Sequence, residues 1–382
     1  SARTVRHKAG KLVFGPDSIP DNLLFLVSGT IRVSQTSDNG RDIVLYRVEA
    51  GESCVLTTAC MLAEEAYNAE GIAETDVTAV TLPKAAFDQL AAEGKKVYPK
   101  TAIIELIQNK LHQKEFYKTN GIPTADFIVT ENKSAVEKQK HFLPFVNKLA
   151  TGGYDGRGVQ VIKSEDALHK AFDAPGFVEE LVDFEKELSV VVARNEAGEI
   201  QTFPTVEMVF HPEKNLVEYL FSPAEIESNI EEEAQSLAKD LIQKLDMVGL
   251  LAIEMFLPKD GKLLVNEIAP RTHNSGHQSI EGNVTSQFEQ HLRAILNWPL
   301  GDTENVSASA MLNVLGEDGY TGEAIYEGMD EVLATAGVHV HLYGKKLTKP
   351  FRKMGHITIT DNDKNRLREK VNFVKSQLKV KA

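Results

Sequence analysis

The sequence has little of what marks secreted, membrane-spanning or nucleic-acid-binding proteins. Its 382 residues include only two cysteines, too few for a disulfide framework. No apolar run approaches the roughly 20 residues of a membrane-spanning helix, and residues 1–10 have no apolar signal-peptide core. The formal net charge of -13 offers no broad attraction for nucleic acid. We therefore expect a cytoplasmic protein that binds neither membrane nor nucleic acid.

Two patterns divide the chain. Residues 23–82 contain short β-prone runs separated by turn signals, which predicts a small β-roll or barrel. From Val97 onward, helical and strand patterns alternate. Residues 103–120 and 230–244 have apolar residues at helical spacing, the second with Asn229 as a plausible N-cap. The second helix precedes two predicted strands, at 249–256 and 263–268, which a short turn joins.

A glycine-rich loop follows a lysine in the second region. Lys148 precedes residues 151–158 (TGGYDGRG), in which four of eight residues are glycine. Without Cβ atoms, backbone N–H groups approach phosphate oxygens closely, and a lysine on the preceding strand adds a positive charge. A plain hairpin turn explains the glycines alone equally well. The tyrosine, aspartate and arginine within the loop favour phosphate binding.

Two glutamates lie inside the two predicted apolar strands. Glu254 and Glu267 would be costly there unless they are paired or bind a cation. A hairpin brings them side by side, where their repulsion favours a cation such as Mg²⁺ bound with nucleotide phosphates. Asn266 could join them only if the strand bends, because neighbouring side chains point to opposite faces. The alternative is a pair of structural salt-bridge partners.

Polar residues are concentrated directly after the second of these strands. Arg271, His273 and Asn274 supply a guanidinium, an imidazole and an amide, donors suited to a planar anion such as bicarbonate or an acyl phosphate. Farther on, residues 345–353 hold five cations. Such a run is most often a solvated loop, but in an acidic protein it is also a reasonable receptor for a substrate phosphate.

Together these residues resemble the ATP-grasp family of N5-carboxyaminoimidazole ribonucleotide synthetases, from about residue 95 to the end of the chain. The matching strings are LIQNKLHQK at 106–114, GGYDGRG at 152–158, NEIAPR at 266–271, HNSGH at 273–277, TSQFEQH at 285–291 and RKMGH at 352–356. The resemblance implies a carbon–nitrogen ligase of de novo purine biosynthesis. With ATP and Mg²⁺, it would carboxylate 5-aminoimidazole ribonucleotide with bicarbonate through carboxyphosphate.

The resemblance also assigns residues to each ligand. Implied ATP contacts are Lys110, Lys148, Gly153, Tyr154, Asp155, Gly156, Arg157, Gly158, Glu179, Glu180, Leu181, Val182, Glu187, His211 and Asn266. The implied Mg²⁺ ligands are Glu254 and Glu267, and the implied catalytic, bicarbonate-holding residues are Arg271, His273 and Asn274. The ribonucleotide would contact Tyr154, Asp155, Arg157, Lys345, Arg352 and Lys353. The family also implies a homodimer.

The beginning of the chain departs from this family, which usually starts with a Rossmann-like domain carrying a GGGQLG pattern. Residues 11–90 instead resemble the β-roll sensor of the cAMP-receptor and Fnr-like regulators, in strings such as LFLVSGTIRV at 24–33 and LPKAAF at 82–87. Residues 65–70 lack the arginine that grips a cyclic phosphate, so we do not expect cAMP binding. Cys54 and Cys60 are expected to be buried thiols rather than metal ligands.

The two resemblances imply an α+β protein of three domains: a β-roll at 1–95, an ATP-grasp domain at 96–300 and a C-terminal domain at 301–382 that completes the substrate site. Carboxylation is the favoured function. The alternatives are an effector-sensing or chimeric protein whose ATP-grasp unit has altered or no turnover, and an ATP-grasp ligase with a different substrate.

Overall fold

The computed structural model describes residues 2–16, 18–36, 42–54, 57, 67, 69–83, 86, 89, 92–151, 158–210 and 216–382. The chain forms two compact units, Ser1–Val97 and Tyr98–Ala382. No helix in the described parts is both long and apolar enough to cross a membrane. The division of the second unit into two domains at residue 300 stays a prediction.

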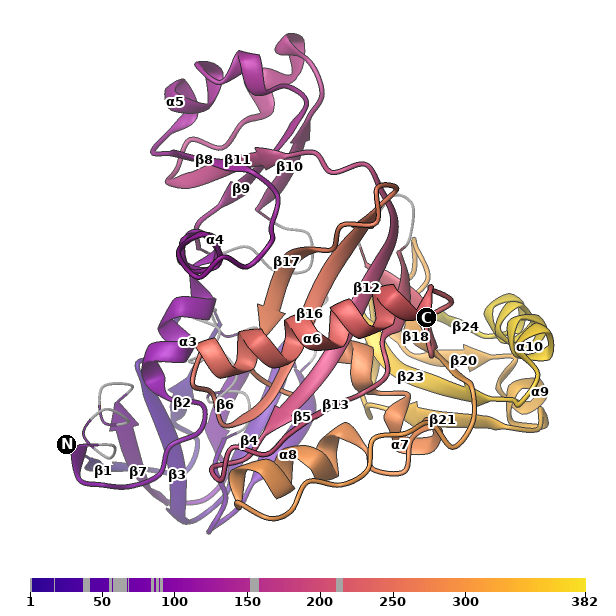
Figure 1. Ribbon diagram of the computed structural model, residues 1–382. Coiled ribbons are helices and arrows are strands. Elements are labelled where there is room, and N and C mark those ends of the chain that lie inside the picture. Colours follow the sequence, from indigo (N-terminus) through magenta and orange to yellow (C-terminus); the bar gives the residue numbers. More distant parts are fainter. Residues whose placement is uncertain are drawn as a thin grey trace. The chain divides into compact units, whose positions relative to one another are not determined.

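The described strands of the first unit form two antiparallel sheets (Figure 1). One has the order β1-β7-β3 and the other β2-β6-β4-β5. The strands are β1 Arg3–His7, β2 Leu12–Phe14, β3 Asn22–Ser28, β4 Ile31–Thr36, β5 Asp42–Val48, β6 Glu70–Ala73 and β7 Val77–Pro83. Alternate side chains such as Ile31 and Val33 are fully buried between the sheets. The predicted β-roll is confirmed, and Cys54 is buried as expected; Cys60 lies outside the described residues.

The second unit begins with two helices and a small antiparallel sheet in the order β10-β9-β11-β8. The elements are α3 Thr101–Gln108, α4 Lys110–Thr119, β8 Phe127–Thr130, α5 Lys133–Glu137, η1 Lys140–Phe142, β9 Phe145–Leu149, β10 Val159–Ile162, η2 Glu165–Lys170 and β11 Gly176–Glu180. Phe145, Ile162 and Val178 are fully buried in the core of this sheet. Lys148 lies on β9, shortly before the glycine-rich loop at 151–158.

A nine-stranded antiparallel sheet forms the centre of this unit, in the order β17-β16-β12-β14-β15-β18-β23-β21, with β13 beside β12. Its strands are β12 Phe184–Arg194, β13 Ile200–Thr202, β14 Val206–Phe210, β15 Val217–Ser222, β16 Gly249–Pro258, β17 Leu264–Ala269, β18 Ser309–Leu315, β21 Val338–Leu342 and β23 Lys353–Thr360. Five further helices are α6 Ser228–Lys244, α7 Ser279–Gly282, α8 Gln287–Ile295, α9 Met329–Leu333 and α10 Lys364–Gln377, with a short η3 at Asn274–Gly276. Two small strand pairs join β19 Gly322–Glu323 to β22 Leu347–Thr348 and β20 Ile325–Glu327 to β24 Lys379–Lys381.

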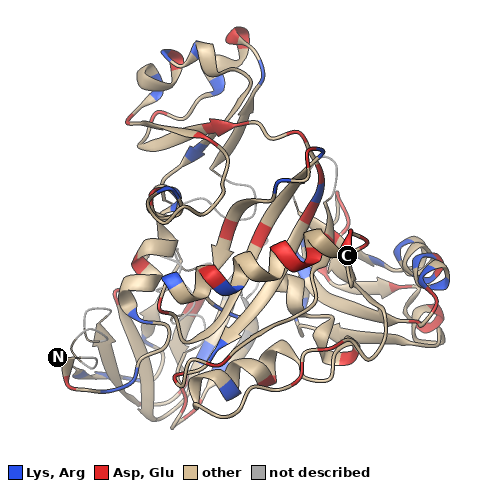
Figure 2. Ribbon diagram, in the orientation of Figure 1, with Lys and Arg blue, Asp and Glu red and all other residues tan. Residues whose placement is uncertain are grey.

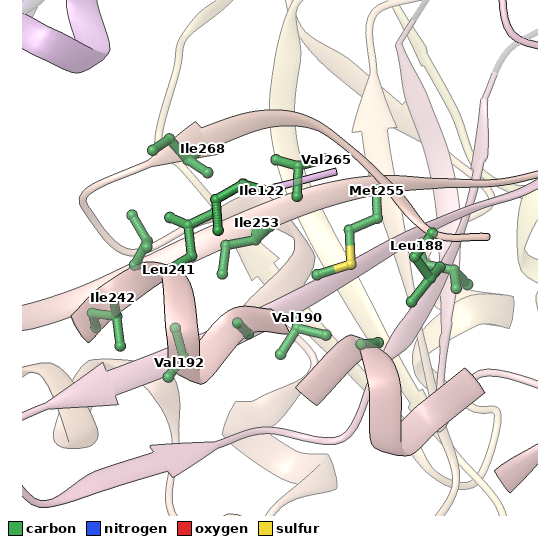
Figure 3. Packing of buried hydrophobic residues seen from close by; sticks show 14 of the residues in the cluster. Ile122, Leu188, Val190, Val192, Leu241, Ile242, Ile253, Met255, Val265 and Ile268 are labelled. Atoms are coloured by element: carbon green, nitrogen blue, oxygen red, sulfur yellow. The ribbon is translucent and has the colours of Figure 1, made fainter. Parts of the chain in front are cut away.

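Helix α6 covers one face of the sheet at β12, β16 and β17 (Figure 3). Its buried residues recur at helical spacing, and Leu241 and Ile242 pack against Val190, Val192 and Ile253. Truncation of such a fully buried leucine to alanine costs about 2–5 kcal/mol. The other face of β12 and β16 packs against α8 through Ala294. The site carboxylates lie on this second face, away from α6.

Two local predictions need correction. The predicted single helix at 103–120 is two helices, because Asn109 adopts extended angles (φ -109, ψ 107) and its side chain accepts the N–H groups of Leu111 and His112. Asparagine offers its backbone this alternative to a continuous helix. The N-cap of α6 is Glu227 rather than Asn229, and Glu227 makes no side-chain cap hydrogen bond. The break at Asn109 places Lys110 at the start of α4.

Candidate functional site

The two glutamates predicted to bind a cation lie directly opposite each other. Glu254 on β16 pairs in register with Glu267 on β17, and Figure 2 shows an acidic segment on each of these neighbouring strands. Burial, followed by the charges of Glu267 and of Glu187 on β12, raises the pKa of Glu254 to about 8. Burial likewise raises the pKa of Glu187 to about 7. Without a cation, burial and mutual repulsion therefore favour the protonated form of Glu254 at neutral pH.

The donor set fits a hard divalent cation that brings further ligands with it. Carboxylate oxygens are the protein ligands that Mg²⁺ prefers, usually one or two of them with water and phosphate oxygens completing the octahedron. Within the described ranges, no group of three or more His, Cys, Asp or Glu side chains could hold a metal ion. Glu254 and Glu267 would thus bind Mg²⁺ together with a phosphorylated ligand.

A β-bulge brings Asn266 to the same side as Glu267. The register of β16 and β17 shifts between Glu254 and Met255, so that Asn266 has no partner in the ladder. Asn266 Oδ1 accepts a hydrogen bond from Lys148 Nζ at 3.1 Å, while Glu267 Oε2 lies 2.7 Å from Lys110 Nζ. The bend that the sequence reasoning required is present. Both residues line one small pocket with the two lysines.

Lys148 also belongs to a buried cluster of charged side chains. Glu179 on β11 pairs with Lys148 and, at 2.8 Å, with Lys114 on α4. Burial alone would raise the pKa of Glu179, but the two ammonium groups outweigh it and lower that pKa. Sequence reasoning missed Lys114, although it lies four residues after Lys110 on one helix face.

Residues 179–182, four of the implied ATP contacts, begin at this buried cluster, and we name them the hinge. Glu179 faces the lysines, Glu180 is exposed, and Leu181 and Val182 are half-buried in the link between β11 and β12. Their contact with a nucleotide stays a prediction, as does that of Glu187. Six predicted site residues lie outside the described residues: Gly153, Tyr154, Asp155, Gly156, Arg157 and His211. Gly158 is described and has a left-handed φ of 74°, which glycine adopts without strain.

The loop after β17 holds His273 in one orientation, and we name residues 271–277 the anion loop. The backbone N–H of Ser275 donates to His273 Nδ1 at 3.3 Å, and Ser275 Oγ lies 2.9 Å from the same nitrogen. Buried Ser189 on β12 contacts Ser275 Oγ at 2.8 Å. Because Nδ1 accepts, the neutral ring carries its proton on Nε2, which lies 3.5 Å from Glu254 Oε1.

Electrostatics keep this imidazole neutral. Burial, followed by the charges of Arg271 and Lys353, lowers the pKa of His273 to about 3. The ring therefore offers an N–H donor beside the carboxylate pair at neutral pH. Arg271 itself is exposed, and its Nη1 donates to Thr272 O at 3.0 Å.

Gln287 at the start of α8 fixes the backbone of the anion loop. Its Oε1 accepts the N–H of His273 at 2.9 Å, and its Nε2 donates to His273 O at 2.8 Å and contacts His277 Nδ1 at 3.0 Å. A Cβ on Gly276 would lie 2.5 Å from Gln287 Oε1, so this approach requires glycine. The matching string at 285–291 contains Gln287, but no local signal assigns it this contact.

A stack of imidazoles lies beside the anion loop. The rings of His277 and His356 are 4.6 Å apart, those of His356 and His341 4.4 Å, and Phe288 stacks on His277 at 5.8 Å. Burial, followed by neighbouring charges, lowers the pKa of His277 to about 4 and that of His356 to about 3. Neutral rings can stack closely without charge repulsion. Sequence reasoning did not find this stack.

The predicted phosphate receptor is only partly assembled. Lys353, at the start of β23, is close enough to act electrostatically on Glu254, His273 and His277. Lys345 Nζ donates to Lys353 O at 2.5 Å, and Arg352 Nη1 donates to Leu347 O at 3.0 Å. Lys353 therefore acts electrostatically on the site, whereas Lys345 and Arg352 donate to nearby backbone carbonyls.

Comparison with known proteins gives the same order of parts. Residues 4–93 match the cyclic nucleotide-binding domain, 115–288 the ATP-grasp domain and 309–370 the phosphoribosylaminoimidazole carboxylase C-terminal domain. The chain is 40% identical over 288 residues to N5-carboxyaminoimidazole ribonucleotide synthase from Synechococcus elongatus, covering 73% of this chain and 71% of that protein. The chain belongs to the N5-carboxyaminoimidazole ribonucleotide synthase family.

Solved structures of this synthase family agree with the fold. N5-carboxyaminoimidazole ribonucleotide synthetase from Thermotoga maritima superposes with a TM-score of 0.72 at 44% identity, over 79% of this chain and 80% of that one. The Aspergillus clavatus synthase, in complex with ADP and 5-aminoimidazole ribonucleotide, gives 0.68 at 32% identity, over 77% and 79%. The chain spans 50% to 71% of the length of the curated relatives that it matches.

Proposed function

We propose that this protein uses ATP and Mg²⁺ to carboxylate 5-aminoimidazole ribonucleotide with bicarbonate, a ligase step of de novo purine biosynthesis. One observation carries the proposal: Glu254 and Glu267 lie between Lys110 on one side and His273 of the anion loop on the other. A cation on the carboxylates would hold nucleotide phosphates against the lysines and keep them within reach of an anion in the loop. The names of the chain's relatives supply the substrate.

Different residues would have different roles in a phosphoryl transfer. Lys110 and Lys148 would hold the ATP phosphates, and Mg²⁺ on Glu254 and Glu267 would neutralise charge on them, with Asn266 alongside. A bicarbonate oxygen attacks the γ-phosphorus, the bond to the β-phosphate breaks, and carboxyphosphate and ADP result. Positioning and charge neutralisation supply most of the rate enhancement in such transfers.

The anion loop would hold the bicarbonate and then the acyl phosphate. Arg271, His273 and Asn274 present donors to its oxygens, and His273 does so as a neutral ring. The exocyclic amine of the ribonucleotide then attacks the carboxyl carbon, which releases inorganic phosphate and leaves the carbamate. Water must be excluded from this labile intermediate, a task that we assign to the glycine-rich loop at 152–158.

The ribonucleotide would lie on the opposite side of the anion loop from ATP. Lys353 acts electrostatically on Glu254, and Lys345 and Arg352 precede it in the chain. We propose that these three cationic side chains contact the substrate phosphate, and that Tyr154, Asp155 and Arg157 face the ribonucleotide. Hinge residues 179–182, Glu187 and His211 are proposed to bind the nucleoside part of ATP.

ADP release with and without 5-aminoimidazole ribonucleotide tests this function. With Mg²⁺, ATP and bicarbonate present, the ribonucleotide should stimulate ADP release, and Glu267→Gln should abolish it while the unfolding midpoint stays close to that of the parent. Release that does not respond to the ribonucleotide refutes the proposed substrate. Full activity of Glu267→Gln removes Glu267 from the metal site.

The match of residues 4–93 to the cyclic nucleotide-binding domain supports a second candidate, in which an effector in the β-roll acts on an ATP-grasp unit of altered or no turnover. Titration calorimetry with cAMP and cGMP distinguishes the two candidates, since absence of heat counts against cyclic-nucleotide sensing. A cytoplasmic location and a homodimer also remain proposals, which cell fractionation and light scattering on the purified protein test.

A further inference from the structure

A second amide holds the amide of Asn274 in the anion loop. Asn274 Nδ2 donates to Asn313 Oδ1 at 2.9 Å, and Asn313 Nδ2 donates back to Asn274 Oδ1 at 3.1 Å. Asn313 lies on β18, 39 residues farther along the chain. Each amide supplies one donor and one acceptor, so the pair fixes the plane of both groups.

The carbonyl of Val217 on β15 determines the orientation of both amide groups, that is, which side of each carries the oxygen and which the nitrogen. Asn313 Nδ2 also donates to Val217 O at 2.7 Å. A backbone carbonyl can only accept, so the nitrogen of Asn313 must lie on that side. Both N–H bonds of Asn313 are then used, and its oxygen receives Asn274 Nδ2. Among the described residues, the second N–H of Asn274 has no acceptor, which leaves it for a ligand.

Packing alone does not explain Asn313. Its neighbours Leu312 and Val314 belong to the apolar core on one face of β18, whereas Asn313 is 7% exposed on the other face. A buried amide costs free energy unless its hydrogen bonds are made. Within the described residues, the hydrogen bonds of this side chain go to Asn274 and Val217 alone. The bond to Val217 fixes the Asn313 amide, and the other two join it to Asn274 of the anion loop.

We propose that Asn313 is a positioning residue that aims one N–H of Asn274 at the oxyanion bound in the loop. This inference rests on the proposed function of that loop and adds a residue to it. Without Asn313, the Asn274 amide can rotate and present its oxygen, which repels an anion, as readily as its nitrogen. The ligand is a small planar oxyanion, bicarbonate in the proposed reaction.

Steady-state kinetics give the first test. In Asn313→Ala, the KM for bicarbonate should rise about tenfold, the worth of one well-placed hydrogen bond, while the KM for ATP changes little. In an Asn274→Ala background, Asn313→Ala should add no further change, because the two residues act as a unit. Equal increases in both KM values, or additive effects in the double variant, overturn the proposal.

A spectroscopic test does not depend on turnover. The side-chain NH₂ signals of Asn274 in ¹⁵N-labelled protein are assigned by their loss in Asn274→Ala. Asn313→Ala, or Asn313→Leu if alanine prevents folding, removes the acceptor of the Asn274 N–H and should speed their exchange with solvent and shift them toward free-amide values. Asn305→Ala is the matched control, because that amide bonds to Ser222 and Asn283 instead.

The outcomes of this second test are separate from those of the activity assay. Unchanged Asn274 signals in both Asn313 variants overturn the positioning role even if the protein is fully active. Responsive Asn274 signals in a protein that shows no ribonucleotide-dependent ADP release support the positioning role and count against the proposed function alone.

Discussion

Replacement of Glu254 by glutamine should remove a distinct pH dependence from the stability of the second unit. The folded-state pKa of Glu254 is raised from 4.5 to about 8, so the folded chain keeps a proton that the unfolded chain releases above pH 4.5. The stabilising effect of that proton is fully present below pH 4.5 and is lost as pH rises toward 8. The contribution of Glu254 to the stability of the metal-free parent should therefore fall across this range.

The magnitude follows from the size of the shift. Each pKa unit corresponds to about 1.4 kcal/mol, so a shift from 4.5 to about 8 sets an upper limit of about 5 kcal/mol. The side chain of Glu254 is 22% exposed, which leaves most of this effect unscreened. Glu254→Gln keeps the shape of the side chain and cannot ionise. The difference in free energy of unfolding between parent and variant should thus change by several kcal/mol between pH 5 and pH 8.5.

Urea unfolding in the presence of EDTA measures this difference. Trp298 is the one tryptophan of the chain and lies in the second unit, so its fluorescence follows the unit that contains Glu254. A variant at the exposed Glu304 controls for the change in net charge. His273, His277 and His356 have lowered pKa values, so they add stability to parent and variant alike as pH rises to about 6.5. This contribution cancels in the difference between the two proteins. Parallel pH profiles of parent and Glu254→Gln would refute the reasoning.

Three further substitutions test separate parts of the site. Glu179→Leu leaves the buried Lys114 without its counter-ion and should lower the free energy of unfolding by about 3–5 kcal/mol in urea titrations; a loss below about 1 kcal/mol contradicts the buried pair. Ser275→Ala should lower kcat about tenfold by freeing the His273 ring, and an unchanged kcat assigns Ser275 no such role. Arg352→Ala should raise the KM for the ribonucleotide more than that for ATP, and equal increases argue against a phosphate receptor.

The sequence was sufficient wherever a local pattern determined the structure. Apolar alternation placed Glu254 and Glu267 inside two strands, and a short turn between these strands forced them to pair. The β-roll followed from closely spaced strands and turns, and α6 from its apolar spacing. At these positions the residues that decide the structure lie within a few positions of one another.

Contacts between distant segments could not be predicted in this way. Lys148 and Asn266 are 118 residues apart, and the bulge that turns Asn266 toward Lys148 leaves no mark in the strand pattern. The Lys114–Glu179 pair and the imidazole stack likewise join separate elements. Helical spacing continued through residue 109 and concealed the break, because capping by Asn109 is a side-chain effect that periodicity does not record.

Transfer of an oxygen atom from bicarbonate to phosphate tests the central claim most directly. The protein would be incubated with Mg²⁺, ATP, 5-aminoimidazole ribonucleotide and ¹⁸O-bicarbonate, and the inorganic phosphate released would be analysed by mass spectrometry. Attack of bicarbonate on the γ-phosphate predicts one ¹⁸O atom in that phosphate, dependent on the ribonucleotide and lost in Glu267→Gln. Unlabelled phosphate would show that water attacks ATP instead, and would contradict carboxylation through carboxyphosphate.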